Sequence, residues 1–384
     1  MRNSLYIFSF RKLLLLAIPF LIWQVAELFF LPIDAFTFRA WETTSINDVF
    51  SIPGYFYPNQ DLLKVEAGDQ DRFRVKRKTV HWVTDKYGFR NTPVVNEPRQ
   101  YDVVLIGDSN FAGSYISQEN TLTEVLSKKC NCSVYNFSKG LTGNIVGFFN
   151  SERFQISPPR TVVFEIRRVD IESRVLPELH FCNKGLNSKA DTSFSMNCVE
   201  KGWIQTLISK MSIEKQILVD RFSKQAFLQY IKSRLGLIVR ELLSFLRNRQ
   251  WSWNRIDELV APPISNISGQ DLDSNIHYSF KKILTYHAAA KSRGIRFIFL
   301  LLPSIDRKYD SLVQRLENAG VEVIGFLPDL KHPWDWDDYK KWVHVEDTHW
   351  LESSIVETAD IITQKLSSKK DGSPQVKFDY GDAR

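Results

Sequence analysis

Residues 101–109 read YDVVLIGDS, and this stretch decides the fold class. Its central part, residues 102–106, is a short and largely apolar run that ends at Gly107. Such a run is typical of a parallel strand that is buried on both faces. Because strands and helices alternate along the chain, the sequence predicts a doubly wound α/β sheet. The other expected strands lie at 133–137, 161–166, 296–302 and 321–324, and the expected helices at 122–129, 278–291, 310–319 and 351–366.

Composition and charge indicate a globular protein. The chain has 384 residues, of which 43% are hydrophobic and 24% charged, and this excludes a disordered chain. The net charge is +6, and residues 201–258 alone hold 11 Lys and Arg against 5 Asp and Glu, which equals the excess of the whole chain. There is no long basic run and no nucleic-acid motif, so this charge indicates a local surface and not a nucleic-acid-binding protein.

The N-terminus has the pattern of a membrane anchor. Three cations within residues 1–12 precede an apolar stretch that begins with residues 13–23 and continues to about Pro32. Roughly 20 apolar residues suffice to cross ~30 Å of hydrocarbon. The cations predict a cytoplasmic N-terminus and an extracytoplasmic, periplasmic body in the inner membrane. A cleaved signal peptide is the alternative, but without an A-x-A-like site an uncleaved single-pass anchor at residues 1–33 is favoured.

The rest of the chain divides by pattern. Residues 34–98 are expected to form an irregular lead-in with one strand pair near 73–83. The α/β domain is expected at 99–367, with a helical insertion at about 173–270. The charged residues 368–384 are expected to form a mobile tail.

Four cysteines allow more than one reading. If the body is extracytoplasmic, disulfides are permitted, and a bridge between Cys182 and Cys198 would close a polar loop. Cys130 and Cys132 lie two residues apart, so a direct bridge between them is expected to be strained. The alternative for all four is a set of free, partly buried thiols, and zinc binding is poorly supported because no second close ligand pair follows.

Gly107 to Ser109 lie at the carboxyl end of the first buried strand, where open α/β sheets place their ligand chemistry. Gly107 permits a tight turn, because it has no side chain to clash. Ser109 could act as a nucleophile near a helix start, where backbone N–H groups favour a developing oxyanion. The ordinary alternative is a turn or helix cap, for which Asp and Ser are common.

Asp347 to Trp350 read DTHW and could supply the base that a serine nucleophile needs. His349 can take the hydroxyl proton, and Asp347 can orient the imidazole and stabilise its charged form. The alternative is a helix cap with a packed histidine. Both segments lie near the ends of one α/β domain, and together they predict one site with Ser109, His349 and Asp347 as catalytic residues.

These segments carry a family resemblance. Residues 107–109, a glycine-containing block at 136–143 and Asp-x-His at 347–349 resemble the SGNH/GDSL hydrolase superfamily. The sequence of residues 347–350, together with Pro303-Ser304 after a core strand, is similar to the corresponding motifs of the alginate O-acetylation proteins and related polysaccharide O-acetyltransferases. The resemblance implies a three-layer, flavodoxin-like α/β/α fold and an acyl-serine mechanism. It covers about residues 100–180 and 275–367.

This sequence departs from the family pattern in three ways. In the alginate proteins the Asp-x-His block precedes the serine, whereas Ser109 comes first here, as in ordinary SGNH enzymes. The Gly-x-Asn-Asp block that helps to bind the oxyanion is replaced after the third strand by residues 165–168. Arg167 in that segment could donate to the oxyanion instead, or it could be a structural ion-pair residue. The glycine of the second block is the third departure, because two candidates stand there.

Five residues are therefore the candidates for oxyanion and substrate binding. The resemblance makes Gly140 the first choice for an oxyanion N–H and Gly143 the second, and Asn144 could supply a side-chain amide. Trp350 is placed with them, beside His349, and Arg167 completes the set.

The expected function is O-acetylation of a cell-surface or secreted polysaccharide by a membrane-anchored enzyme. Since one spanning helix cannot carry an acyl group across a membrane, a separate membrane acyltransferase would deliver the acyl donor. No cofactor or metal and no nucleic acid is expected. The first alternative is a carbohydrate esterase that uses the same three residues, and the second is a non-catalytic polysaccharide-binding assembly subunit.

Overall fold

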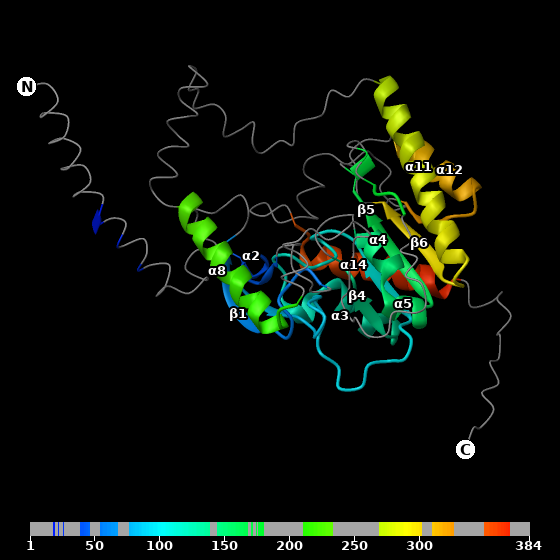
Figure 1. The fold of residues 1–384 in the computed structure, drawn as a ribbon. Coiled ribbons are helices and arrows are strands. Elements are labelled where there is room, and N and C mark those ends of the chain that lie inside the picture. The colour runs from blue at the N-terminus through cyan, green and yellow to red at the C-terminus, as the bar shows by residue number, and fades with distance from the viewer. Residues whose placement is uncertain are drawn as a thin grey trace, which may run out of the picture. The chain divides into compact units, whose positions relative to one another are not determined.

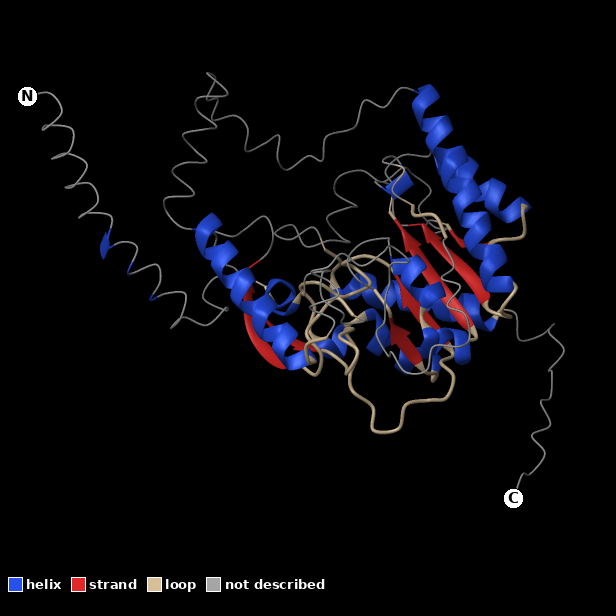
Figure 2. Ribbon diagram, in the orientation of Figure 1, coloured by secondary structure: helices blue, strands red, loops and turns tan. Residues whose placement is uncertain are grey.

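A five-stranded parallel sheet is the core of the computed structural model (Figure 2). In space the strands follow the order β4-β3-β5-β6-β7, and each neighbouring pair is parallel. In chain order this is 2-1-3-4-5, the flavodoxin-like arrangement. The predicted α/β class is confirmed. The strands are β3 (Val103–Ile106), β4 (Val134–Asn136), β5 (Thr161–Ile166), β6 (Arg296–Leu301) and β7 (Glu322–Ile324).

The structure describes part of the chain. The described residues are 18–19, 22, 26, 39–46, 54–67, 77–138, 144–167, 170–171, 174, 176–179, 210–232, 269–301, 309–325 and 349–368. The chain divides into two units, the first made of Met1–Ile52 with Glu200–Ser268 and the second of Pro53–Val199 with Gly269–Arg384. The sheet lies in the second unit. The predicted boundaries of lead-in, insertion and tail stay predictions.

Helices cover both faces of the sheet (Figure 1). On one face, α3 (Leu122–Cys130) and α14 (Glu352–Ser367) pack with Leu105 and Val163 into one hydrophobic core. On the other face, Tyr286 of α11 (Gly269–Lys291) packs edge-on against Phe164, with ring centroids 5.7 Å apart. Alternate residues of each strand thus meet opposite helix layers. The further helices are α2 (Ala40–Thr44), α4 (Asn144–Asn150), α5 (Glu152–Ile156), α8 (Ile213–Lys232), α12 (Asp310–Asn318) and a 3-10 turn, η2 (Gln118–Asn120).

Helix α3 shows how local chemistry sets an element's bounds. At its start, the Thr121 hydroxyl accepts a hydrogen bond from the Glu124 N–H, which is the usual interaction of an N-cap side chain. Glu124 lies in the first turn and Lys128 and Lys129 in the last, so all three charges suit the helix dipole. Asn131 ends the helix in the left-handed conformation, with φ 49° and ψ 49°.

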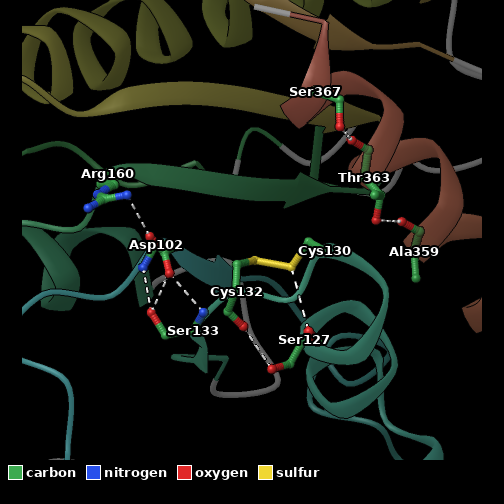
Figure 3. The surroundings of a disulfide bond; sticks show 9 residues. All are labelled: Asp102, Ser127, Cys130, Cys132, Ser133, Arg160, Ala359, Thr363 and Ser367. Atoms are coloured by element: carbon green, nitrogen blue, oxygen red, sulfur yellow. Dashed lines mark hydrogen bonds and ion pairs between the residues drawn. A yellow bond between two sulfur atoms is a disulfide. The ribbon is translucent and has the colours of Figure 1, made fainter. Parts of the chain in front are cut away.

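The left-handed Asn131 lies between two cysteines, which Figure 3 shows joined by a bond between their sulfur atoms. Cys130 and Cys132 form a disulfide across it, with their Cα atoms 5.2 Å apart. The Ser127 hydroxyl donates to the Cys132 carbonyl at 2.8 Å and so fixes the end of the turn. The sequence predicted that a direct bridge here would be strained, with free thiols as the alternative for all four cysteines. For this pair the free-thiol alternative is wrong, because the two sulfurs are bonded. Cys182 and Cys198 lie outside the described residues.

Two antiparallel strands precede the sheet. The strands β1 (Asp61–Ala67) and β2 (Arg77–Val83) pair along their whole length. The prediction of a strand pair near 73–83 is correct for β2, and its partner lies earlier in the chain.

No helix in the described parts of the chain is both long and apolar enough to span a bilayer. The predicted anchor at 1–33 lies almost wholly outside the described residues and stays a prediction.

Candidate active site

Ser109 lies on the turn that follows β3, at the carboxyl edge of the sheet. The chain order reverses between β3 and β5, and ligands of open α/β sheets bind at such a switch point. The turn is held by its own residues: the Asp108 carboxylate accepts the Asn110 N–H at 2.7 Å, and the Ser109 carbonyl accepts the Ser114 N–H at 2.9 Å. Ser109 itself is half-buried.

His349 reaches Ser109 from the far end of the chain. Its Nε2 lies 3.0 Å from the Ser109 Oγ, although the two residues are 240 positions apart. The histidine is only 8% exposed, which restricts the ring to this orientation. At this distance the imidazole can take the hydroxyl proton and return it to a leaving group. The structure thus places Ser109 and His349 within hydrogen-bonding distance, as the sequence predicted.

Trp350 fastens the histidine segment to the serine turn. Its backbone N–H donates to the Asn110 Oδ1 at 3.3 Å, and its ring lies edge-on to Phe111, with centroids 5.9 Å apart. The side chain is 4% exposed and belongs to the hydrophobic core beneath α14. This gives Trp350 a packing role that holds the two segments together. Its predicted contact with substrate stays a prediction.

One backbone donor is available beside the nucleophile. In the described part of the chain, no acceptor takes the Ser109 N–H, whereas both flanking amides are engaged by Glu165 and Asp108 side chains. A backbone N–H at the nucleophile can stabilise the negative oxygen of a tetrahedral intermediate. The other predicted donors, Gly140 and Gly143, lie outside the described residues, as does the predicted orienting carboxylate Asp347.

Asn144 begins helix α4, and its amide group is engaged. The Nδ2 donates to the carbonyl of Phe137, just after β4. The Oδ1 is buried and receives no hydrogen bond within the described ranges. One N–H of this amide is therefore engaged by the backbone, and the bond links the start of α4 to the residue that follows β4. A role as oxyanion donor stays a prediction.

Arg167 forms a network of ion pairs. Its Nη1 lies 3.2 Å from the Asp108 Oδ2, and its Nη2 lies 2.9 Å from the Asp170 Oδ1. Burial lowers the pKa of Arg167, but the hydrogen bond to Asp170 and the charge of Asp108 raise it more. Of the two sequence readings, the structure places Arg167 in the structural ion pair. It acts on the site through Asp108, the neighbour of the nucleophile.

Glu165 is the residue that sequence reasoning missed. It is the last residue but one of β5 and is 1% exposed, and its Oε2 accepts the Asp108 N–H at 2.9 Å. Burial, and after it the charge of Asp108, raise the pKa of the Glu165 carboxyl well above its usual value. The available signal was an acidic residue within the otherwise apolar run of residues 161–166. A buried acid must be either paired with another group or protonated, and such acids are common at functional sites.

Gly107 is required by its neighbours. A Cβ there would stand 2.0 Å from the Glu165 Oε2 and 2.8 Å from the Phe111 Cγ. We expect Gly107→Ala to lower the free energy of unfolding by about 2 kcal/mol, because overpacking a filled site forces its neighbours to shift. Activity toward an ester should fall by at least about tenfold, since that shift moves Ser109. Chemical denaturation and ester turnover measure both.

Gly325→Ala is the matched control for this change. Among the described atoms, its new Cβ would meet the two methyl groups of Val313, at 3.3 and 3.8 Å, on a side chain that can adjust. It should leave ester turnover unchanged. Equal stability and equal activity of the two variants would contradict the close packing at Gly107.

Metal binding receives no support from side-chain clusters. Among the described residues, no three His, Cys, Asp or Glu side chains gather as a metal ion would require. The prediction that the site uses no cofactor stays untested.

Comparison with known proteins gives one structural match. It pairs 68% of this chain with 97% of a proposed lipolytic protein of the G-D-S-L family from Desulfitobacterium hafniense DCB-2, at 11% sequence identity and a TM-score of 0.35. No protein-family model and no curated protein matches the chain. The assignment of the site therefore rests on the geometry of Ser109 and His349.

Proposed function

We propose that this protein is a serine-dependent acyl-transfer enzyme. The observation that carries the proposal is the 3.0 Å separation of His349 Nε2 from Ser109 Oγ, at the switch point of a parallel sheet. A hydroxyl needs such a base to become a nucleophile, and an α/β sheet presents its chemistry at this edge. The sequence resemblance to SGNH enzymes adds support of a different kind.

The first half-reaction forms an acyl-serine. The Ser109 hydroxyl gives its proton to His349 Nε2 while Oγ attacks the acyl carbonyl carbon. The negative carbonyl oxygen then lies where the Ser109 N–H can stabilise it. As the intermediate collapses, the carbonyl re-forms, the bond to the leaving alkoxide breaks, and His349 returns the proton to that oxygen. The acyl group stays on Ser109 as an ester.

The second half-reaction determines the function. If a sugar hydroxyl attacks the acyl-serine, the product is an O-acylated carbohydrate. If water attacks, the enzyme is an esterase. We propose transfer of acetyl groups to a polysaccharide at an extracytoplasmic membrane face, with a separate membrane acyltransferase as source of the donor. Support comes from the sequence of residues 347–350 and from the anchor pattern at 1–33.

The test measures how the acyl-enzyme is resolved. Purified protein is incubated with 4-nitrophenyl acetate, with and without an oligosaccharide, and the acetyl group is located by mass spectrometry. We expect an acetyl adduct on Ser109 that decays faster with the oligosaccharide and yields an acetylated sugar. Decay at one rate in both samples would replace transfer by hydrolysis. Absence of any adduct would replace catalysis by a binding role.

Ser114→Ala is the control for adduct position. Ser114 lies in the same loop and is 2% exposed. Its hydroxyl has no role in the proposed chemistry, so the variant should form the adduct at the wild-type rate.

A further inference from the structure

We propose that Glu165 is a positioning residue of the Ser109 site and acts as a neutral carboxylic acid beneath the turn. This inference rests on the proposed function and deepens it. Glu165 does not touch the substrate. It holds Asp108, and through Asp108 it fixes the direction of the Ser109 side chain.

The geometry places Glu165 directly under the nucleophile turn. Its Oε2 accepts the Asp108 N–H at 2.9 Å, and the missing side chain of Gly107 leaves the space that this carboxyl fills. On the neighbouring strand β6 its pairing partner is Leu300, which carries no charge. A carboxyl enclosed in this way cannot turn toward water. The hydrogen bond from the Asp108 N–H holds it in this place.

Charge balance assigns the proton to Glu165. The groups in the described chain that act electrostatically on it are Asp108 and Arg167. Arg167 lies 3.2 Å from the Asp108 carboxylate and is itself held by Asp170, so the negative charge next to the cation belongs on Asp108. Glu165 Oε1 is buried and has no hydrogen-bond partner among the described residues, a position that costs a charged carboxylate oxygen more than a neutral one.

The protonation state has a physical cause. Burial raises the pKa of Glu165, and the charge of the nearby Asp108 raises it further. The charge of Arg167 lowers it, but with less effect. When two buried carboxyl groups lie close together, the charge on one opposes ionisation of the other.

Loss of that proton should disable the site. An ionised Glu165 would place a second negative charge against Asp108 in a site that water cannot screen. The turn would then move away from β5, and Ser109 Oγ would leave the reach of His349. Activity should therefore fall on the alkaline side as Glu165 ionises. The acidic limb, where His349 gains a proton, is a separate event.

Folding stability should follow the same proton. In the unfolded chain Glu165 loses it near its ordinary pKa of 4.5, whereas the folded protein keeps it to a higher pH. Between those two values the folded state binds more protons than the unfolded state. The contribution of this group to stability therefore falls as pH rises through that window, and it is constant above it.

The test compares Glu165→Gln and Glu165→Leu with the wild type. The amide of glutamine can accept the Asp108 N–H and donate to the Asp108 carboxylate, but it has no proton to lose. We expect Glu165→Gln to keep kcat within about threefold at neutral pH and to lack the alkaline fall, because neutral hydrogen bonding suffices. Glu165→Leu should lose at least about 100-fold in kcat with KM little changed, because misplaced reacting groups slow the chemical step.

Thermal unfolding against pH gives a readout that needs no catalysis. The decline of Tm with pH should be weaker in Glu165→Gln than in the wild type, and Glu357→Gln is the matched control. The pKa of Glu357 is also raised, by burial first and then by Asp360, but it lies on the outer side of α14. The Glu357→Gln variant should therefore keep the fall in activity at alkaline pH.

The outcomes separate the two proposals. If Glu165→Gln loses as much activity as Glu165→Leu, or keeps the wild-type alkaline fall and Tm profile, the neutral-acid role is rejected. If Ser109→Ala stays fully active, the proposed function fails, whatever the Tm profiles show. If Ser109→Ala is inactive and Glu165→Gln behaves as expected, both proposals stand.

Discussion

Replacing Ser109 by alanine is expected to lower kcat for ester cleavage by about 10⁴-fold, because the covalent route then has no nucleophile. The background that survives would come from binding and from the backbone N–H at position 109. The measurement is steady-state kcat with a chromogenic acetate ester, alongside the far-ultraviolet circular dichroism spectrum that shows the fold to be intact.

The interaction between Ser109 and His349 sharpens this test. His349→Ala should cost nearly as much as Ser109→Ala, and the double variant should cost little more than either, since residues that act as one unit are not additive. Independent losses that multiply in the double variant would show that the two side chains do not share one step. A single variant that keeps a tenth of wild-type kcat would exclude the 3.0 Å pair as the catalytic one.

Replacing Arg90 by leucine is expected to reduce the free energy of unfolding by about 4 kcal/mol, because it leaves buried polar partners without a donor. The Arg90 side chain is fully buried. Its Nη1 donates to the carbonyls of Ala112 and Gly113, and its Nη2 donates to those of Ile116 and His81. The first three carbonyls belong to the loop that follows Ser109.

Two further contacts fix the Arg90 guanidinium. It stacks 3.9 Å from the centre of the Trp82 ring, and its Nε donates to the Gln118 side chain at 3.2 Å. Burial lowers the pKa of Arg90, and the charge of the buried Glu66 opposes that effect. Because the serine loop loses its main support, Arg90→Leu should also reduce ester turnover at temperatures where the fold persists.

The controls for Arg90 are a conservative change and a distant one. Arg90→Lys keeps the charge but cannot reach all the carbonyls, so its loss of stability should be intermediate. Arg99→Leu removes an exposed arginine and should change stability by less than about 0.5 kcal/mol. Urea unfolding measures all three, and a loss below about 1 kcal/mol for Arg90→Leu would show that the carbonyls find other donors.

Much of the fold was accessible from local pattern. Each predicted sheet strand lies within two residues of the observed one, because a parallel strand buried on both faces is a continuous apolar run. The order of the strands was not accessible from such runs, since it depends on how the connections cross the sheet. The pairing of Ser109 with His349 could be predicted because both chemical types stand at the ends of expected elements.

Other features depend on tertiary contacts that no local pattern encodes. In β1 the polar Lys64 and Glu66 face inward, whereas Leu63 and Val65 are 73% and 56% exposed, the reverse of the usual alternation. The buried charge of Arg90 accounts for the inward Glu66. The proton that we propose on Glu165 likewise depends on Asp108 and on enclosure by the finished fold. Spacing alone argued against the Cys130–Cys132 bridge, because the left-handed turn between them was not foreseen.

The separation of Ser109 from His349 also has a consequence in time. A ribosome that adds about 5 to 20 residues per second would need about 12 to 48 s to make the 240 residues between them. If Ser109 and His349 act as proposed, the growing chain carries the nucleophile but not its base during that interval. We therefore expect the proposed reactivity to begin only after α14 docks against the sheet.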